Sequence, residues 1–219
     1  MTQSKEHSYV YNIEDYRGYA ELKAMTAICH QELKNVNWDI LARKLQEGKK
    51  ETTSIGPSWE YATGNDKILF DSTDSASSNI VALPTHELGS WTYLLILPVN
   101  DDQVNYHINS LVKDIFQKTI KAVKTLPGVF HAHLNRFTPN FSVPQHVDDP
   151  NGSRVLVVLT LQVSKTSAEL VTIGFNKKIY NFKDTEYFVF DPQIEHYADN
   201  KSDSDWVIMS IQIEKSYFE

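Results

Sequence analysis

The chain has 219 residues, of which 41% are hydrophobic, 11% aromatic and 22% charged, and its formal net charge is −7. This composition excludes a disordered or fibrous protein, and the length is sufficient for one domain with a sizeable core. The acidic balance argues against a nucleic-acid partner, because binding to phosphates would need a basic surface.

The cysteine content and the hydropathy pattern indicate in which cellular compartment the protein is expected. The single cysteine, Cys29, excludes an intramolecular disulfide and fits a reducing environment. It lies in a helix-like segment, so we interpret it as a buried core thiol rather than a nucleophile. The N-terminus is polar without an apolar signal core, and the longest apolar stretch, residues 91–99, has the length of a strand. We therefore expect a soluble cytoplasmic protein without a membrane span; the sequence leaves its oligomeric state open.

The first part of the chain predicts helices and loops. Apolar residues spaced by three and four predict helices over residues 19–30 and 38–46, with Asn37 as the N-cap of the second. Residues 53–79 are rich in Ser, Thr, Asp and Asn, which indicates an exposed loop that serves either as a lid over a site or as a simple connector. Residues 1–89 are thus expected to form an N-terminal helical and loop elaboration of a single domain spanning the whole chain.

From residue 90 onward, short strands dominate the pattern. Residues 90–98 predict a strand, and apolar offsets of three and four over 105–123 predict one helix. The stretch 129–137 then alternates with a period of two, as a strand does. Further β-branched or aromatic segments separated by turn residues follow at 154–163, 170–174, 177–182, 186–191 and 206–214. The predicted fold class is therefore mainly β with flanking helices (α+β), with a sandwich or barrel core over residues 90–214.

One polar cluster interrupts these strands. In the segment LNRFTPNFSVPQHVDDPNGSRVLVVLTL, His146 and Asp148 stand two residues apart and can project from the same face of a strand. His196 follows a later strand, so both histidines fall where strands meet loops. Two histidines and one carboxylate that leave other positions open are the ligand set of non-haem Fe(II) oxygenases, whereas the plain alternative is a surface turn. Asp149 is a rival carboxylate, but its spacing suits a strand face poorly.

Two further histidines, His131 and His133, share one face of the predicted strand 129–137. Their geometry permits metal ligation. No carboxylate accompanies them, however, so we interpret them as packing or hydrogen-bonding residues.

The order NRFTPNFSVPQHVDD, then Arg154 and an apolar strand, then FVFDPQIEH and a last strand resembles the aspartyl/asparaginyl β-hydroxylase family of Fe(II)/2-oxoglutarate-dependent dioxygenases. TIKAVKTLPGVFHAHLNRF is similar to the segment that leads into that family's double-stranded β-helix, a jelly-roll or cupin-like barrel. The resemblance implies that His146, Asp148 and His196 bind Fe(II), and that 2-oxoglutarate and dioxygen bind beside them. It also implies a substrate that is an amino acid, an amino-acid-derived small molecule or a peptidyl residue.

The resemblance further implies a cation for the distal carboxylate of 2-oxoglutarate, usually an arginine on the last strand. That position is occupied by Trp206, either as a core residue or as the lining of a different pocket, and no arginine follows Arg154. Arg154 is our candidate replacement, with a solvated turn residue as the alternative. Arg136 is the second candidate, against a structural ion pair, and strand parity suggests hydroxyl contacts from Ser210 and Thr160.

Three functions remain open at this point. The first is an Fe(II)/2-oxoglutarate-dependent dioxygenase. The second retains the iron but lets the substrate itself bind the open face in place of 2-oxoglutarate, because the expected arginine is missing. The third is a non-catalytic β-barrel binding protein whose polar cluster is structural.

Overall fold

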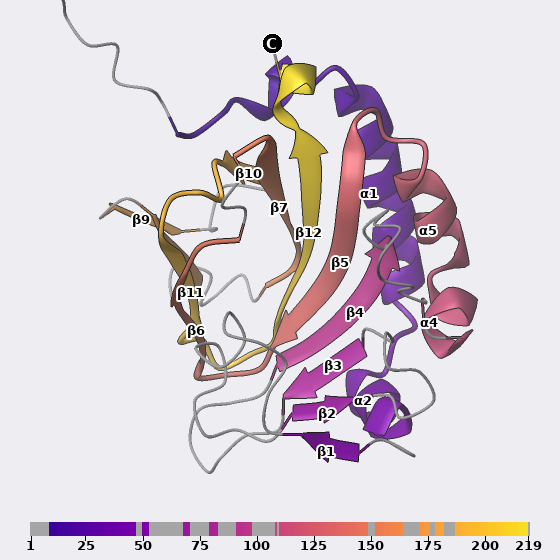
Figure 1. Cartoon of the computed structure of the whole chain (residues 1–219). Helices are drawn as coiled ribbons and strands as arrows, with labels where there is room; N and C mark the ends of the chain where they lie inside the picture. Colours follow the sequence, from indigo (N-terminus) through magenta and orange to yellow (C-terminus); the bar gives the residue numbers. More distant parts are fainter. Residues whose placement is uncertain are drawn as a thin grey trace, which may run out of the picture.

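A computed structural model gives the fold of the chain (Figure 1). The structure describes residues 9–46, 50–52, 68–70, 79–82, 91–97, 108, 110–148, 152–163, 171–175, 178–181 and 187–218. Within these residues the helices are η1 (Ile13–Asp15), α1 (Tyr19–Leu33), α2 (Trp38–Gln46), α4 (Ser110–Ile115), α5 (Gln117–Val123) and η3 (Lys215–Phe218). The strands are β1 (Lys50–Thr52), β2 (Ile68–Phe70), β3 (Asn79–Ala82), β4 (Trp91–Leu97), β5 (Val129–Phe137), β6 (Phe141–His146), β7 (Arg154–Gln162), β8 (Val171–Phe175), β9 (Lys178–Asn181), β10 (Tyr187–Phe190), β11 (His196–Asn200) and β12 (Trp206–Glu214).

The described strands form two antiparallel sheets. The larger sheet has the order β1-β2-β3-β4-β5-β12-β7-β10, and the smaller has the order β6-β11-β8-β9. From β5 to β12 the chain passes repeatedly between the two sheets, which is the topology of a double-stranded β-helix, or jelly roll. Helices α1, α4 and α5 cover the face of the larger sheet that points away from the smaller one (Figure 1). The predicted fold class, mainly β with flanking helices around a cupin-like barrel, is confirmed.

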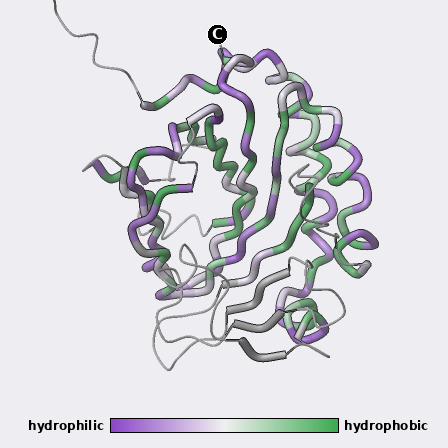
Figure 2. The backbone as a smooth tube through the Cα atoms, viewed as in Figure 1, coloured by the Kyte–Doolittle hydropathy of each residue, from purple (hydrophilic) through white to green (hydrophobic). Residues whose placement is uncertain are grey.

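The larger sheet has an apolar face toward the helices and a face with both polar and apolar residues toward the interior of the barrel. On β5, Ala132 and Leu134 are fully buried on the side that faces the helices. Residues 131, 133, 135 and 137 alternate with them and point into the barrel. Hydrophobic residues follow the central strands of this sheet (Figure 2). The period-two alternation predicted over 129–137 is therefore the strand β5.

A tight turn connects β5 and β6. Residues 138–140 reverse the chain after β5, with Asn140 in the left-handed region at φ 65°, a conformation that asparagine tolerates better than most residues. The Phe141 N–H donates to the Thr138 carbonyl at 3.2 Å. Strand β6 then runs back, so its last residue, His146, lies at the end of the barrel where β5 began.

The helix predicted over 105–123 is instead two short helices, α4 and α5. The backbone at Phe116, between them, is non-helical at φ −109° and ψ 32°. The carboxylate of Glu32, on α1, accepts the N–H groups of Lys118 and Thr119 at 2.9 Å each. These bonds satisfy donors of the first turn of α5, as a cap does. The apolar spacing is continuous across the break, so the sequence pattern alone could not reveal it.

The N-terminal prediction needs one correction. Strands β1 to β3 extend the larger sheet beyond β4, in a region where only helices and loops were expected. Edge strands pair through backbone groups, so a polar composition does not prevent them. The rest of the loop, 53–67 and 71–78, lies outside the described residues. The helix 38–46 has the predicted bounds, and its predicted cap is present, since the Ile40 N–H donates to Asn37 Oδ1 at 3.0 Å.

Cys29 is fully buried, and burial is the main cause that raises its pKa to about 12, so it is a core thiol and not a nucleophile. Among the described residues, the longest helix has 15 residues, and none is both long and apolar enough to cross a bilayer.

Candidate metal centre

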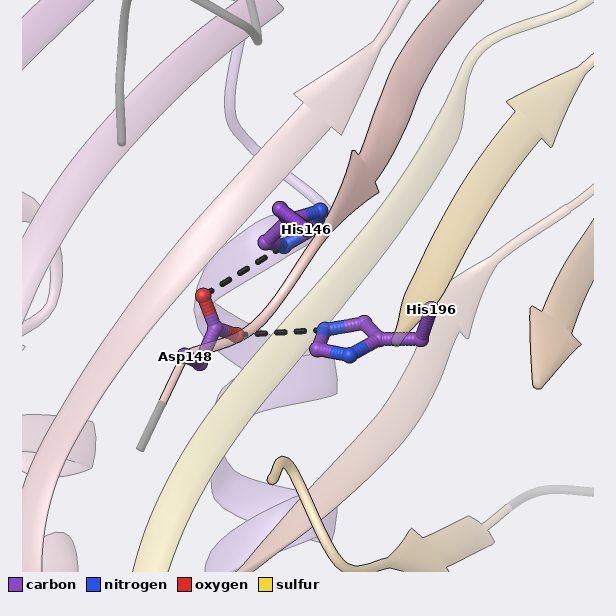
Figure 3. Close-up of side chains that lie close together, drawn as sticks. All are labelled: His146, Asp148 and His196. Carbon is purple, nitrogen blue, oxygen red and sulfur yellow. Dashed lines mark ion pairs between the residues drawn. The ribbon is translucent and has the colours of Figure 1, made fainter. Parts of the chain in front are cut away.

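His146, Asp148 and His196 meet at one end of the barrel (Figure 3). His146 ends β6 and His196 begins β11, and the two are direct neighbours across this strand pair. Asp148 Oδ1 lies 3.3 Å from His146 Nε2, and Asp148 Oδ2 lies 3.3 Å from His196 Nε2. The three potential ligand atoms all lie within 4.8 Å of one another. The structure thus brings together the three residues that the sequence singled out.

Asp148 is positioned by a long-range hydrogen bond and not by the geometry of a strand. Strand β6 ends at His146, so Asp148 lies beyond it rather than on its face. The Asp148 N–H donates to the carbonyl of Pro192 at 3.1 Å, in the segment that leads to His196. This long-range bond holds the carboxylate between the two imidazoles. The rival carboxylate, Asp149, lies outside the described residues.

His196 presents a defined nitrogen to the cluster. Its Nδ1 lies 2.9 Å from the Ile194 carbonyl, which can only accept, so Nδ1 carries the proton. In the neutral ring the lone pair is then on Nε2, the nitrogen that faces Asp148, and a histidine that ligates a metal needs this tautomer. The ring of Phe190 packs edge-on against His196 with centroids 4.9 Å apart and supports the ring orientation.

The carboxylate is ionised and the cluster has one open side. Burial raises the pKa of Asp148, but when Nε2 of each ring carries a proton, hydrogen bonds and charge interactions with His146 and His196 lower it more, so the pKa lies well below its usual range. The side chains of His196, His146 and Asp148 are 6%, 22% and 36% exposed. A small molecule would therefore approach from the side of Asp148 and His146.

The donor set fits a divalent transition metal. Ligands at 2.0–2.2 Å from one ion lie about 3 Å from their neighbours, close to the spacing of the carboxylate and imidazole atoms in this cluster. Two neutral imidazoles and one carboxylate suit Fe(II) and leave the rest of its coordination sphere for other ligands. Within the described part of the chain, these three are the residues that group in this way.

A second polar cluster lies on the inner wall of the larger sheet. His131 Nε2 lies 3.0 Å from the Tyr93 hydroxyl and 3.1 Å from His133 Nδ1, and the Tyr93 and His133 rings stack with centroids 4.6 Å apart. Burial is the main cause that lowers the pKa of His131 to about 4 and that of His133 well below its usual value. Both rings are neutral at pH 7, and their roles are the hydrogen bonding and packing that we expected. Tyr93 was missed because its apolar surroundings carry no signal of a site.

Comparison with known proteins identifies the family. A sequence model of the aspartyl/asparaginyl β-hydroxylases matches residues 37–216. The chain belongs to this family. The assignment confirms the resemblance carried by the metal-site segments, and it supports a hydroxylase activity. No curated protein matches the chain.

Solved structures that align with this β-hydroxylase-family chain share little sequence with it. A predicted oxalate decarboxylase from Thermotoga maritima is 13% identical over 57% of this chain and 82% of that one, with a TM-score of 0.35. A cupin 2 conserved barrel domain protein from Salinispora arenicola is 8% identical over 58% and 79%, with a TM-score of 0.35. A protein from Photorhabdus luminescens is 11% identical over 61% and 82%, with a TM-score of 0.36.

Of the two arginines predicted to serve this family member's site, Arg154 lies at the metal end. It begins β7 opposite Glu214, at the end of the sheet where β5 begins. Its guanidinium carbon lies 3.4 Å from the centroid of the Phe130 ring, in a cation–π contact. Its positive charge contributes to the lowered pKa of His131, after the larger effect of burial. Arg154 is half-buried and is not a solvated turn residue.

The structure does not bring Arg136 to the site. It occupies the opposite face of β5, where its Nε donates to Asp205 at 2.6 Å and its Nη2 to Asp39 at 3.1 Å. The guanidinium also lies over the Trp38 ring at 5.9 Å. These contacts match the structural ion pair that was the alternative, and they correct the expectation that Arg136 contacts the cosubstrate. The physical reason is strand parity: residue 136 faces α2, while 135 and 137 face the barrel.

The remaining predicted residues lie deeper in the barrel. Ser210 is cross-strand neighbour to His133, and its Oγ accepts a hydrogen bond from Asn135 Nδ2 at 3.3 Å. Thr160 faces the same interior from β7. Trp206 is fully buried at the far end, with its ring 5.4 Å from that of Phe137, and is therefore a core residue.

A hollow of about 600 Å³ lies elsewhere, between α1, α2 and α4. It is lined by residues such as Val36, Ile40 and Leu111, and it shares no lining residue with the metal cluster. It offers no group of metal ligands among the described residues. We therefore place the chemistry at the triad and not in this hollow.

Proposed function

We propose that the protein is an Fe(II)/2-oxoglutarate-dependent dioxygenase that hydroxylates an amino acid, an amino-acid-derived small molecule or a peptidyl residue. The observation that carries this proposal is the convergence of His146, Asp148 and His196 in a chain of the β-hydroxylase family. The triad supplies two neutral nitrogens and one charged oxygen and leaves the other coordination positions to exogenous ligands.

Each residue of the triad has a distinct task. His196 presents Nε2 because its Nδ1–H is held by the Ile194 carbonyl. Asp148 supplies the negative charge that offsets part of the charge of the metal, and its depressed pKa keeps it ionised at neutral pH. His146 completes the set from the neighbouring strand and borders the open side.

When bound, Fe(II) and 2-oxoglutarate supply the oxidising chemistry: one oxygen atom of O₂ enters the substrate as a hydroxyl, and the other enters the succinate formed with CO₂. The chain positions and shields the reactants. The apolar rings of Phe190 and Phe188 border the site from β10 and limit the access of water. Arg154 lies at the same end as the triad and would meet a carboxylate of the cosubstrate or substrate.

The test separates binding from turnover. With Fe(II) added under anaerobic conditions, addition of 2-oxoglutarate should produce a weak metal-to-ligand charge-transfer band in the visible spectrum. With O₂ admitted, succinate release against a panel of amino acids should identify the substrate class. Failure to bind any divalent metal would remove the proposal in favour of a non-catalytic barrel.

A second function is favoured by one observation, the core tryptophan Trp206 at the position where the resemblance implies an arginine. In this alternative the iron is retained and the substrate itself occupies the open face, without 2-oxoglutarate. Iron binding without the charge-transfer band would support this second function over the first.

A further inference from the structure

The inner wall of the larger sheet carries a row of polar residues below the metal triad. Cross-strand pairing places His133 next to Ser210 on one rung, and Asn135 with Thr160 on the next, on either side of Ile208. The side chains of directly paired residues point to the same face of a sheet. The first rung continues through Val158 to Phe188, whose ring packs against Tyr180 of the smaller sheet. We call the four residues His133, Asn135, Ser210 and Thr160 the polar wall.

Three members of the polar wall are almost completely buried. Asn135, Ser210 and Thr160 are 4%, 5% and 9% exposed. The Thr160 hydroxyl makes no hydrogen bond within the described part of the chain. An unpaired hydroxyl in a barrel interior is costly unless a ligand supplies the partner. The hydrogen bond that joins two wall members, from Asn135 Nδ2 to Ser210 Oγ, is long at 3.3 Å.

The polar wall lies at a suitable depth for one end of a short molecule. The rung of Leu156 and Phe190 is level with the triad, because the Phe190 ring packs on His196. Ser210 and His133 occupy the next rung, roughly 6.6 Å further along the strands, and Thr160 lies one rung deeper on the neighbouring strand β7, diagonal to Ser210. A five-carbon dicarboxylate that chelates the metal with one end would bring its other carboxylate to about this level.

No wall residue is charged at neutral pH. Burial keeps His133 uncharged, and the other three side chains are amides or hydroxyls. The stacked Tyr93 ring and the bond to His131 hold the His133 ring in place. Neutral donors in a desolvated site can hold an anion when several converge on it.

We propose that the polar wall receives the distal carboxylate of 2-oxoglutarate, with Ser210 and Thr160 as hydroxyl donors, in place of an arginine on the last strand. This inference rests on the proposed function and adds the site of the cosubstrate's far end. It leaves Arg154, at the triad end, to the carboxylates that lie beside the metal.

The experiment measures 2-oxoglutarate binding by calorimetry to the full chain loaded with Mn(II), which avoids turnover. The variants are Thr160→Val and Ser210→Ala, each of which removes one hydroxyl. Each should weaken 2-oxoglutarate binding about ten- to hundredfold, the effect of losing a hydrogen bond to a charged group. Mn(II) affinity, followed by electron paramagnetic resonance, should change less than about threefold, because neither residue belongs to the triad.

Two matched controls accompany these variants. Thr160→Ser retains the hydroxyl and should retain most of the affinity, which separates the lost donor from altered packing. Thr92→Val removes a buried hydroxyl from β4, where Thr92 pairs with Arg136 on the other face of the sheet, and should leave 2-oxoglutarate binding unchanged.

The outcomes distinguish this inference from the proposed function. If the wild type binds 2-oxoglutarate and both Thr160→Val and Ser210→Ala bind it equally well, the polar wall is not the carboxylate site and the proposed function stands. If the metal-loaded wild type does not bind 2-oxoglutarate, both are overturned. If the variants lose Mn(II) as well, their side chains support the triad and the inference fails. Ser210→Ala alone suffices as the test should Thr160→Val not fold.

Discussion

Replacing His196 by alanine tests the metal centre most directly. The substitution removes Nε2 from the triad and leaves His146 and Asp148 in place. The His196 side chain is 6% exposed, packs on Phe190 and donates one hydrogen bond to the Ile194 carbonyl. Metal binding and folding stability should therefore both fall, by amounts that can be estimated separately.

The stability loss is limited. Truncating a buried ring of this size costs about 3 kcal/mol. The lost hydrogen bond adds about 1 kcal/mol. A domain of ordinary stability, about 5–15 kcal/mol, remains folded after such a loss. For a chain of this length, Tm should fall by about 8–16 °C.

The same substitution should weaken metal binding strongly. Outer partners of metal ligands already change affinity by about 10- to 100-fold, so removal of a direct ligand should weaken Fe(II) binding by at least about 100-fold, or about 2.7 kcal/mol. Anaerobic Fe(II) titration measures this affinity, and calorimetric melting of the metal-free protein measures the stability.

The matched control is His30→Ala, which removes a half-buried histidine from α1, outside the triad. It should leave stoichiometric Fe(II) binding intact. A folded His196→Ala protein that still bound one equivalent of Fe(II) with wild-type affinity would refute the assigned triad.

Three further predictions follow from the same geometry. His146→Ala should abolish tight Fe(II) binding with a smaller fall in Tm than His196→Ala, because the His146 side chain is 22% exposed; equal melting losses in the two variants would contradict this ranking. Arg154→Ala should weaken 2-oxoglutarate binding at least about tenfold in calorimetry while Mn(II) affinity is retained, and an unchanged 2-oxoglutarate affinity would remove Arg154 from that role. The metal-free protein should lose about 1–3 kcal/mol of unfolding free energy as pH falls from 6.5 towards 4, because the unfolded chain binds protons at His131 and His133 that the folded chain does not bind until the pH reaches their lowered pKa values, about 4 for His131. Urea unfolding at pH 7 and pH 5 measures this slope, which His131→Gln should make shallower.

Much of the fold could be read from local pattern. The helix 38–46 and the strand 206–214 have the bounds that apolar spacing predicted, and the alternation over 129–137 sorted barrel-facing from helix-facing residues. Such patterns arise within one element, because each element must bury one face, so a single sequence contains them. The ligand types were visible for a related reason: imidazole and carboxylate are rare among apolar strands.

Hydrogen bonds and strand pairings between distant segments could not be predicted from local sequence patterns. The helix break at Phe116 depends on the carboxylate of Glu32, and the position of Asp148 depends on the carbonyl of Pro192. The segment His196–Asn200, where the sequence pattern predicted no strand, is a strand because it pairs with β6 and β8 on both sides. In each case the partner lies far away in the sequence, and the residues of the segment itself do not indicate which partner it will have.

The amino-acid sequence by itself determined the class of the fold and the three side chains able to bind a metal, since these follow from periodicity, composition and spacing along the chain, and it carried the resemblance to the family. Tertiary structure alone decided how those side chains are used. It placed Arg136 in ion pairs outside the barrel, Arg154 against the ring of Phe130 and the unpaired hydroxyl of Thr160 inside. The physical reason is that which face of a strand meets the interior, and what meets it there, depends on strand pairing between segments distant in the chain.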